Sequence, residues 1–216
     1  MDKVYIKGKG IKMINPETIT RYDQTDRELE EFILFWVCAA GKNGRTAARC
    51  LDRMLTEHAV MYQNNTPFHW ILSEHALFDL AQTLKYYGIG CYNSKARTFY
   101  ELAVAKFKGE LDLRTCSASD LEKIHGIGPK TARCFILHSR KNAQVAGLDT
   151  HMLKHLKSLG SDVPKSTPTG KKYLELEKVV LSLAKRAKMT PASYDLHIWN
   201  KYSVPSTPGE LNDKHI

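Results

Sequence analysis

The segment Leu121–Cys134, with the sequence LEKIHGIGPKTARC, decides the fold of this chain, together with LDTH at residues 148–151. Its pattern predicts a short helix, a tight turn at Gly126 and Gly128, and a second helix. Glycines permit a turn with positive φ and let backbone N–H groups come close to a phosphate. A helix–hairpin–helix unit with a phosphate contact at its turn is therefore expected.

A lysine and a carboxylate accompany this unit: Lys130 begins the second helix, and Asp149 follows 19 residues later. A lysine amine becomes a nucleophile only after losing its proton, which desolvation or nearby positive charge promotes, and we expect Lys123 and Arg133 to supply such charge. Asp149 can stabilise developing positive charge, or cap the next helix, and both roles can hold. A solvated lysine on a basic helix remains the alternative for Lys130.

The composition indicates a globular, basic protein. The chain has 216 residues, of which 43% are hydrophobic, so it can bury a core in one domain or in two small lobes. Its formal net charge of +9 and pI of about 9.2 favour a polyanionic partner. A soluble basic protein without a nucleic-acid partner would have the same composition.

The five cysteines indicate neither a zinc site nor a disulfide framework, because their number is odd and no C-x-x-C pair occurs. We therefore expect a reducing, intracellular compartment, which is the cytoplasm, the nucleoid or the nucleus depending on the organism. No apolar run approaches the ~20 residues of a membrane span, and no signal peptide or membrane anchor is visible.

Helical periodicity dominates the chain, and no convincing β-hairpin signal appears. Asp26, Ser73 and Ser119 are candidate helix N-caps, and the continuous apolar run at residues 32–40 predicts a buried central helix. We expect an all-α fold. The predicted helices cover residues 26–40, 45–57, 73–85, 94–108, 120–124, 130–139, 150–159, 171–188 and 192–199.

Together, the hairpin, Lys130 and Asp149 resemble the helix-hairpin-helix-GPD superfamily of DNA glycosylases, in the bifunctional form with a lysine nucleophile. The segment GIGCYNSKA at residues 88–96 is also similar to that superfamily, and the likeness extends over about residues 28–200. It implies two helical lobes with DNA bound in the cleft between them. One lobe would hold residues 28–137, and the other would combine residues 1–27 with residues 138–216, including a flexible C-terminal tail.

The resemblance also implies a site. Lys130 would attack C1′ of a flipped nucleotide, and Asp149 would stabilise the developing cation. Backbone N–H groups at Gly126, Gly128 and Lys130 would bind one DNA phosphate, either directly or through a structural monovalent cation. No other metal or cofactor is implied.

Within the superfamily, the chain is most similar to the compact 8-oxoguanine DNA glycosylases. No cysteine follows Cys134, so the four C-terminal cysteines that bind an iron–sulfur cluster in other branches are missing. Cys134, four residues after Lys130, would touch the flipped base, unless it is a buried structural cysteine. DLHIW at residues 195–199 resembles the Asp-Leu-x-x-Trp segment of the compact enzymes, so Trp199 would stack on the base, unless it is a core residue.

One segment departs from the pattern of the family: GKNGR at residues 41–45, where relatives probe the duplex and the opposite base. Lys42, Asn43 and Arg45 would do so here, or would only hold phosphates. His151 would touch DNA or orient the site, although a packed or surface histidine fits equally well.

We therefore expect a monomeric, bifunctional DNA glycosylase and AP lyase of base excision repair that acts on double-stranded DNA containing a damaged base, with 8-oxoguanine as the expected base. The first alternative is a glycosylase for another damaged, mismatched or hypermodified base. The second is a fold reused for transfer chemistry on DNA bases, or for DNA binding alone. The third is a basic helical protein whose motif is a coincidence.

Overall fold

The computed structural model describes residues 14–59, 66–74 and 77–203, and every regular element in these ranges is a helix, as expected. Residues 1–13 and the tail at 205–216 lie outside the described ranges. In chain order the elements are the 3₁₀ turn η1 (Pro16–Thr18) and the α-helices α1 (Asp26–Ala39), α2 (Gly44–Ala59), α3 (Pro67–Glu74), α4 (Leu77–Tyr86), α5 (Tyr92–Phe107), α6 (Ala118–Leu121), α7 (Pro129–Ser139), α8 (Thr150–Ser158), α9 (Gly170–Arg186) and α10 (Pro191–Ser203).

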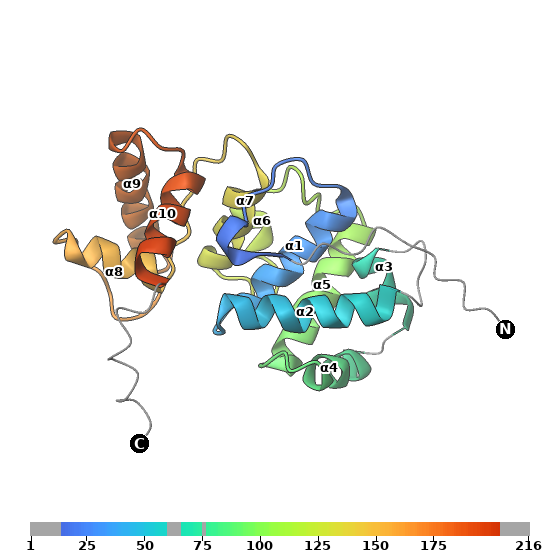
Figure 1. The fold of residues 1–216 in the computed structure, drawn as a ribbon. Helices are drawn as coiled ribbons and strands as arrows, with labels where there is room; N and C mark the ends of the chain where they lie inside the picture. Colours follow the sequence, from blue (N-terminus) through green and yellow to red (C-terminus); the bar gives the residue numbers. More distant parts are fainter. Residues whose placement is uncertain (1–13, 60–65, 75–76, 204–216) are drawn as a thin grey trace, which may run out of the picture.

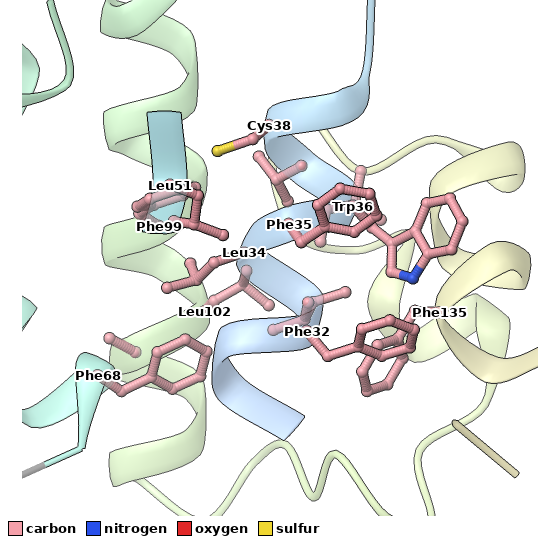
Figure 2. Close-up of a cluster of buried hydrophobic side chains, with 14 of the residues drawn as sticks. Phe32, Leu34, Phe35, Trp36, Cys38, Leu51, Phe68, Phe99, Leu102 and Phe135 are labelled. Atoms are coloured by element: carbon pink, nitrogen blue, oxygen red, sulfur yellow. The ribbon is translucent and has the colours of Figure 1, made fainter. Parts of the chain in front are cut away.

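Helix α1 is the central helix of the larger part of the fold. All of its residues from Leu29 to Cys38 are buried, because α2, α3, α5 and α7 all pack against it. Figure 2 shows Trp36 and Phe32 on the side of α1 that faces α7, while Leu34 points toward the opposite side. The prediction of a buried central helix from the continuous apolar run is confirmed.

The three predicted N-caps are wrong by a few residues. Thr25, rather than Asp26, caps α1 in a capping box with Glu28, and the Asp26 carboxylate instead pairs with Arg114. Ser117, rather than Ser119, caps α6 through the backbone N–H of Asp120. Ser73 lies inside α3, where its hydroxyl donates to the carbonyl of Trp70 at 3.3 Å.

The helices form two lobes, each with its own hydrophobic cluster (Figure 1). The first cluster draws on α1 to α7, and the second on α8, α9, α10 and the segment that precedes α8. Ile19 belongs to the first cluster, although we expected residues 1–27 to join the second lobe, and the neighbouring turn η1 contacts both α2 and α10. No helix in the described ranges is long and apolar enough to span a bilayer.

Candidate active site

A pocket of about 880 Å³ lies where the two lobes meet. Its walls come from the α1–α2 loop, the turn before α7, α7 itself, the start of α8, and α10. The ten residues that the sequence predicted as catalytic, DNA-binding or base-pocket residues all line this pocket: Lys42, Asn43, Arg45, Gly126, Gly128, Lys130, Cys134, Asp149, His151 and Trp199. Residues scattered over 158 positions of sequence thus share one cavity.

The turn before α7 rests on α5. Gly126 has a φ of 78°, and a Cβ there would lie 2.5 Å from the hydroxyl of Thr98, so this position requires glycine. The carboxylate of Glu101 accepts the N–H of His125 at 2.8 Å, which fixes the turn on the surface of α5. These two contacts hold the hairpin before any ligand binds.

Gly128 differs from Gly126, because only Gly126 uses the positive φ that glycine permits. It has a φ of −90°, and nothing lies within 4 Å of a Cβ built on it. Gly128 is the N-cap of α7 and provides no side-chain acceptor for the first N–H groups of the helix, while Pro129 follows at the first helical position. The helix therefore presents open N–H donors to the pocket side, which is the arrangement that binds a phosphate.

Lys130 lies next to the aromatic wall of the pocket. Its Nζ is 5.0 Å from the centre of the Trp36 ring, which is the geometry of a cation–π contact. The expected positive surroundings are not provided by Lys123 and Arg133. Lys123 pairs with Asp120 at 2.8 Å, and Arg133 pairs with both Glu122 and Glu177.

Asp149 is the N-cap of α8, as the sequence allowed. Its carboxylate accepts the N–H of Met152 at 2.8 Å, which fixes the side chain at the pocket wall. Burial, followed by the negative charge of Asp195, raises the pKa of Asp149, while the Met152 hydrogen bond and the charge of Lys130 act in the opposite direction. A raised pKa makes this carboxylate a better proton acceptor than an exposed aspartate.

Cys134 forms part of the floor of the pocket but has almost no free surface, since only 3% of it is exposed. Its sulfur lies against the backbone of Gly147. Burial raises the pKa of the Cys134 thiol to about 12, so it is neutral at physiological pH and cannot act as a nucleophile. Its contribution is to the shape of the site.

Thr20, His138 and Asp195 form a hydrogen-bonded chain at the pocket, which His138 and Asp195 line, and the sequence did not predict it. His138 is fully buried, and its two ring nitrogens lie 2.8 Å from Oγ1 of Thr20 and 3.2 Å from Oδ2 of Asp195. The ring also stacks on Trp36, with the centroids 5.7 Å apart. Two spacings in the sequence could have indicated these residues. His138 lies two helical turns after Lys130, and Asp195 lies one turn before Trp199, so each shares a helix face with a predicted site residue.

Trp199 of α10 and His151 of α8 form another wall of the pocket. Their rings meet edge to face with centroids 6.3 Å apart, and both side chains are half-buried rather than part of a core. Both residues therefore keep surface that a ligand in the pocket can contact.

The α1–α2 loop is held by its own residues. The side-chain oxygen of Asn43 accepts the N–H groups of Arg45 and Thr46, at 3.0 and 3.3 Å, so Asn43 orders the start of α2. The Arg45 guanidinium pairs with Glu17, and both side chains are exposed. The stem of Lys42 lies against Gly90, where any larger residue would displace it.

Among residues 14–59, 66–74 and 77–203, no three His, Cys, Asp or Glu side chains gather as a metal site would require.

Known proteins resemble this chain in sequence and in fold. A family model described as 8-oxoguanine DNA glycosylase matches residues 20–189. A curated 8-oxoguanine DNA glycosylase/AP lyase of Picrophilus torridus is 35% identical over 82 residues, which are 37% of this chain and 37% of that protein. The match thus spans little more than a third of that relative.

Solved structures share the fold over most of the chain. The Methanocaldococcus jannaschii 8-oxoguanine glycosylase/lyase, solved with a 15-mer DNA containing 8-oxoguanine, has a TM-score of 0.65 and 19% identity, and covers 84% of this chain and 83% of its own. The 8-oxoguanine DNA glycosylase of Thermotoga maritima has a TM-score of 0.64 and 21% identity, with 83% and 82% covered. At such identities the likeness is one of fold.

Proposed function

Since this chain belongs to the 8-oxoguanine DNA glycosylase family, we propose that it is a bifunctional DNA glycosylase and AP lyase that excises 8-oxoguanine from double-stranded DNA. One observation carries the proposal: Lys130 and Asp149 line the same pocket, directly beside a helix N-terminus suited to a phosphate. The pocket thus has the nucleophile, the carboxylate and the DNA contact that such chemistry requires.

In this proposal the DNA backbone binds along one side of the pocket. The N–H groups at the start of α7 hold one phosphate, directly or through a monovalent cation at the turn, and Lys42 and Arg45 contact the strands from the α1–α2 loop. Arg45 leaves Glu17 to do so, at little cost because exposed ion pairs are weak. The damaged nucleotide is flipped into the pocket, at a cost of a few kcal/mol in lost stacking.

The flipped base is then held against Trp199, whose half-buried ring offers a stacking surface. Cys134 supports the base pocket through its packing on Gly147. His151 borders the same wall and orients Trp199 through their edge-to-face contact.

The chemistry begins with proton loss from Lys130. The incoming nucleotide separates the amine from the Trp36 ring and excludes water, and Asp149, which lines the same pocket and has a raised pKa, accepts the proton. The neutral amine attacks C1′, the C1′–N bond breaks, and the base departs with its electron pair and then takes up a proton. That proton is the one that Asp149 accepted from Lys130, and the carboxylate, ionised again, stabilises the positive charge that develops on the sugar.

A second step follows at the same residue. The sugar ring opens to a Schiff base between Lys130 and C1′, loss of a C2′ proton expels the 3′ phosphate by β-elimination, and hydrolysis then releases Lys130. We further propose that the protein acts as a monomer, because one chain supplies every wall of the pocket, and that the two lobes divide near the end of α7 at Ser139.

Borohydride trapping on a panel of duplexes tests the proposal. The duplexes carry 8-oxoguanine, thymine glycol, uracil or an abasic site, and a covalent adduct is expected on 8-oxoguanine and on the abasic site. An adduct on the abasic site alone, or on a different base, would move the substrate to another lesion. The absence of any adduct would exclude the bifunctional mechanism.

A further inference from the structure

The segment between α7 and α8 fixes the position of Asp149, yet it has no regular structure of its own. It runs from Arg140 to Asp149, so no helix connects Lys130, at the start of α7, to the carboxylate that it needs. The distance between these two groups is therefore set by side chains that hold the segment. Three such side chains, Arg133, Tyr173 and Glu177, are buried beside it.

Tyr173 on α9 holds the segment by a single oxygen atom. Its hydroxyl donates to the carbonyl of Ala146 at 2.8 Å and accepts the N–H of Leu148 at 3.1 Å. Tyr173 is 1% exposed, and burial raises its pKa, so the hydroxyl stays protonated and the donor is retained. Both bonded residues lie within three positions of Asp149.

Glu177, one turn further along α9, connects the same segment to α7. One of its oxygens accepts the N–H of Ala146 at 2.9 Å and the Nε–H of Arg133 at 3.0 Å. Arg133 is one turn along α7 from Lys130, its guanidinium lies 4.6 Å from the centre of the Tyr173 ring, and it also donates to Glu122 beside the hairpin.

We propose that Tyr173, with Glu177 and Arg133, positions Asp149 relative to Lys130. We call these three side chains the clamp. Tyr173 and Glu177 of α9 hydrogen-bond to the backbone before Asp149, and Arg133 connects Glu177 to α7, the helix that carries Lys130. None of the three lines the pocket, so they are positioning residues that act through the backbone. The inference rests on the proposed function, in which Asp149 assists attack by Lys130.

The test compares Tyr173→Phe with Tyr194→Phe. The first keeps the ring over Arg133 and removes both hydrogen bonds to the segment. The second removes a buried hydroxyl of the same lobe that hydrogen-bonds to His155 at 2.9 Å, and Tyr194 does not line the pocket. Both variants lose one buried hydroxyl, so melting temperatures measured for both separate general stability from positioning.

Two readouts are taken. The first is the single-turnover rate of 8-oxoguanine removal at saturating protein, with duplex affinity measured alongside; the second is hydrogen exchange at the amides of Ala146 and Leu148. Tyr173→Phe is expected to slow removal by roughly tenfold or more with affinity nearly unchanged, because small misplacements of reacting groups are costly. Its Leu148 amide is expected to exchange faster, and Tyr194→Phe is expected to match the wild type in both readouts.

A wild-type rate in Tyr173→Phe would overturn the proposal, whatever the exchange data show. If the wild-type protein removes no base, the proposed function fails by itself, and the clamp is then judged by hydrogen exchange: equal exchange in Tyr173→Phe and wild type would overturn it. If Tyr173→Phe does not fold, Glu177→Met replaces it, since methionine keeps the length of the side chain and removes the acceptor. The same slow rate and fast Ala146 exchange are expected, and wild-type values would refute the clamp.

Discussion

The sulfur of Cys134 lies directly against the backbone of Gly147, in a contact so close that a Cβ atom on Gly147 would overlap it. Gly147 lies two residues before Asp149, and Cys134 lies one turn of α7 after Lys130. The contact therefore brings the two halves of the proposed catalytic pair together, and it explains why a glycine is needed at a position with no positive φ.

Gly147→Ala is expected to destabilise the protein by about 1–3 kcal/mol, because the added methyl group forces the segment away from α7. Cys134→Ala removes the obstructing atom, and the remaining neighbours of the new Cβ would lie at an ordinary 3.8 Å. In that background Gly147→Ala is expected to be nearly neutral. Denaturation of the four proteins of this double-mutant cycle measures the coupling, and an equal cost of Gly147→Ala in both backgrounds would contradict the packing argument.

Asp149→Asn is expected to abolish base removal and yet to stabilise the fold at neutral pH. Burial, and then the charge of Asp195, raises the pKa of Asp149, so its ionised form is less favourable in the folded protein than in the unfolded chain. Wild-type stability therefore falls as the pH rises from the unfolded pKa, about 3.9, through the folded pKa. Asparagine carries no charge and keeps an oxygen for the Met152 N–H.

Melting temperatures of wild type and Asp149→Asn as a function of pH check this expectation. The variant should melt higher at neutral pH, and the gap should close as the pH falls below about 4, where the wild-type carboxyl becomes protonated in both states. A gap that stays constant on acidification would show that the charge of Asp149 is not its origin.

The hairpin and the presence of Lys130 and Asp149 in one pocket could be predicted from the sequence because their signals are local. Gly126 lies in the turn before α7, Lys130 begins α7 and Asp149 caps α8, so each stands at the boundary of a helix that the sequence pattern predicts. The exact N-caps were missed because Thr25 stands beside Asp26, and Ser117 near Ser119. Neighbouring residues of this kind are equally good N-caps by their chemistry. At α1 the choice depends on Arg114, which pairs with the Asp26 carboxylate and leaves Thr25 to cap the helix.

Other parts of the site depend on contacts that no local pattern reveals. Arg133 was expected to supply free positive charge, but it pairs with Glu177, 44 residues later, which only the folded chain brings near. The continuous apolar run of α1 gave no sign that the Trp36 ring would lie beside the Lys130 amine. His138 lies near the end of a predicted helix, and nothing in the local sequence indicates its contacts with Thr20 and Asp195.

Lys42→Gln and Arg45→Gln are expected to weaken duplex binding to a similar extent for damaged and undamaged DNA. Each removes a cation near a phosphate, so each should reduce the slope of log K against log salt concentration by about 1. Arg186→Gln, at the exposed end of α9 and outside the pocket, is the control for loss of one positive charge. A loss confined to damaged DNA would indicate that the loop reads the lesion instead.

Trp199→Ala is expected to lower the efficiency of base removal by one to two orders of magnitude, since stacking of a base on an aromatic ring contributes about 1–3 kcal/mol. Trp199→Phe keeps an aromatic face and should retain most of the activity. Single-turnover rates on an 8-oxoguanine duplex check both variants. Equal activity of the two would mean that Trp199 serves only to pack against His151.

The most direct test of the central claim is borohydride trapping by the wild type, Lys130→Gln and Lys172→Gln on an abasic-site duplex. Lys172 is a lysine of α9 outside the pocket that pairs with Asp162, so its substitution changes the charge equally. We predict a covalent adduct with the wild type and with Lys172→Gln and none with Lys130→Gln. An adduct of wild-type yield with Lys130→Gln would show that another amine is the nucleophile and would contradict the account.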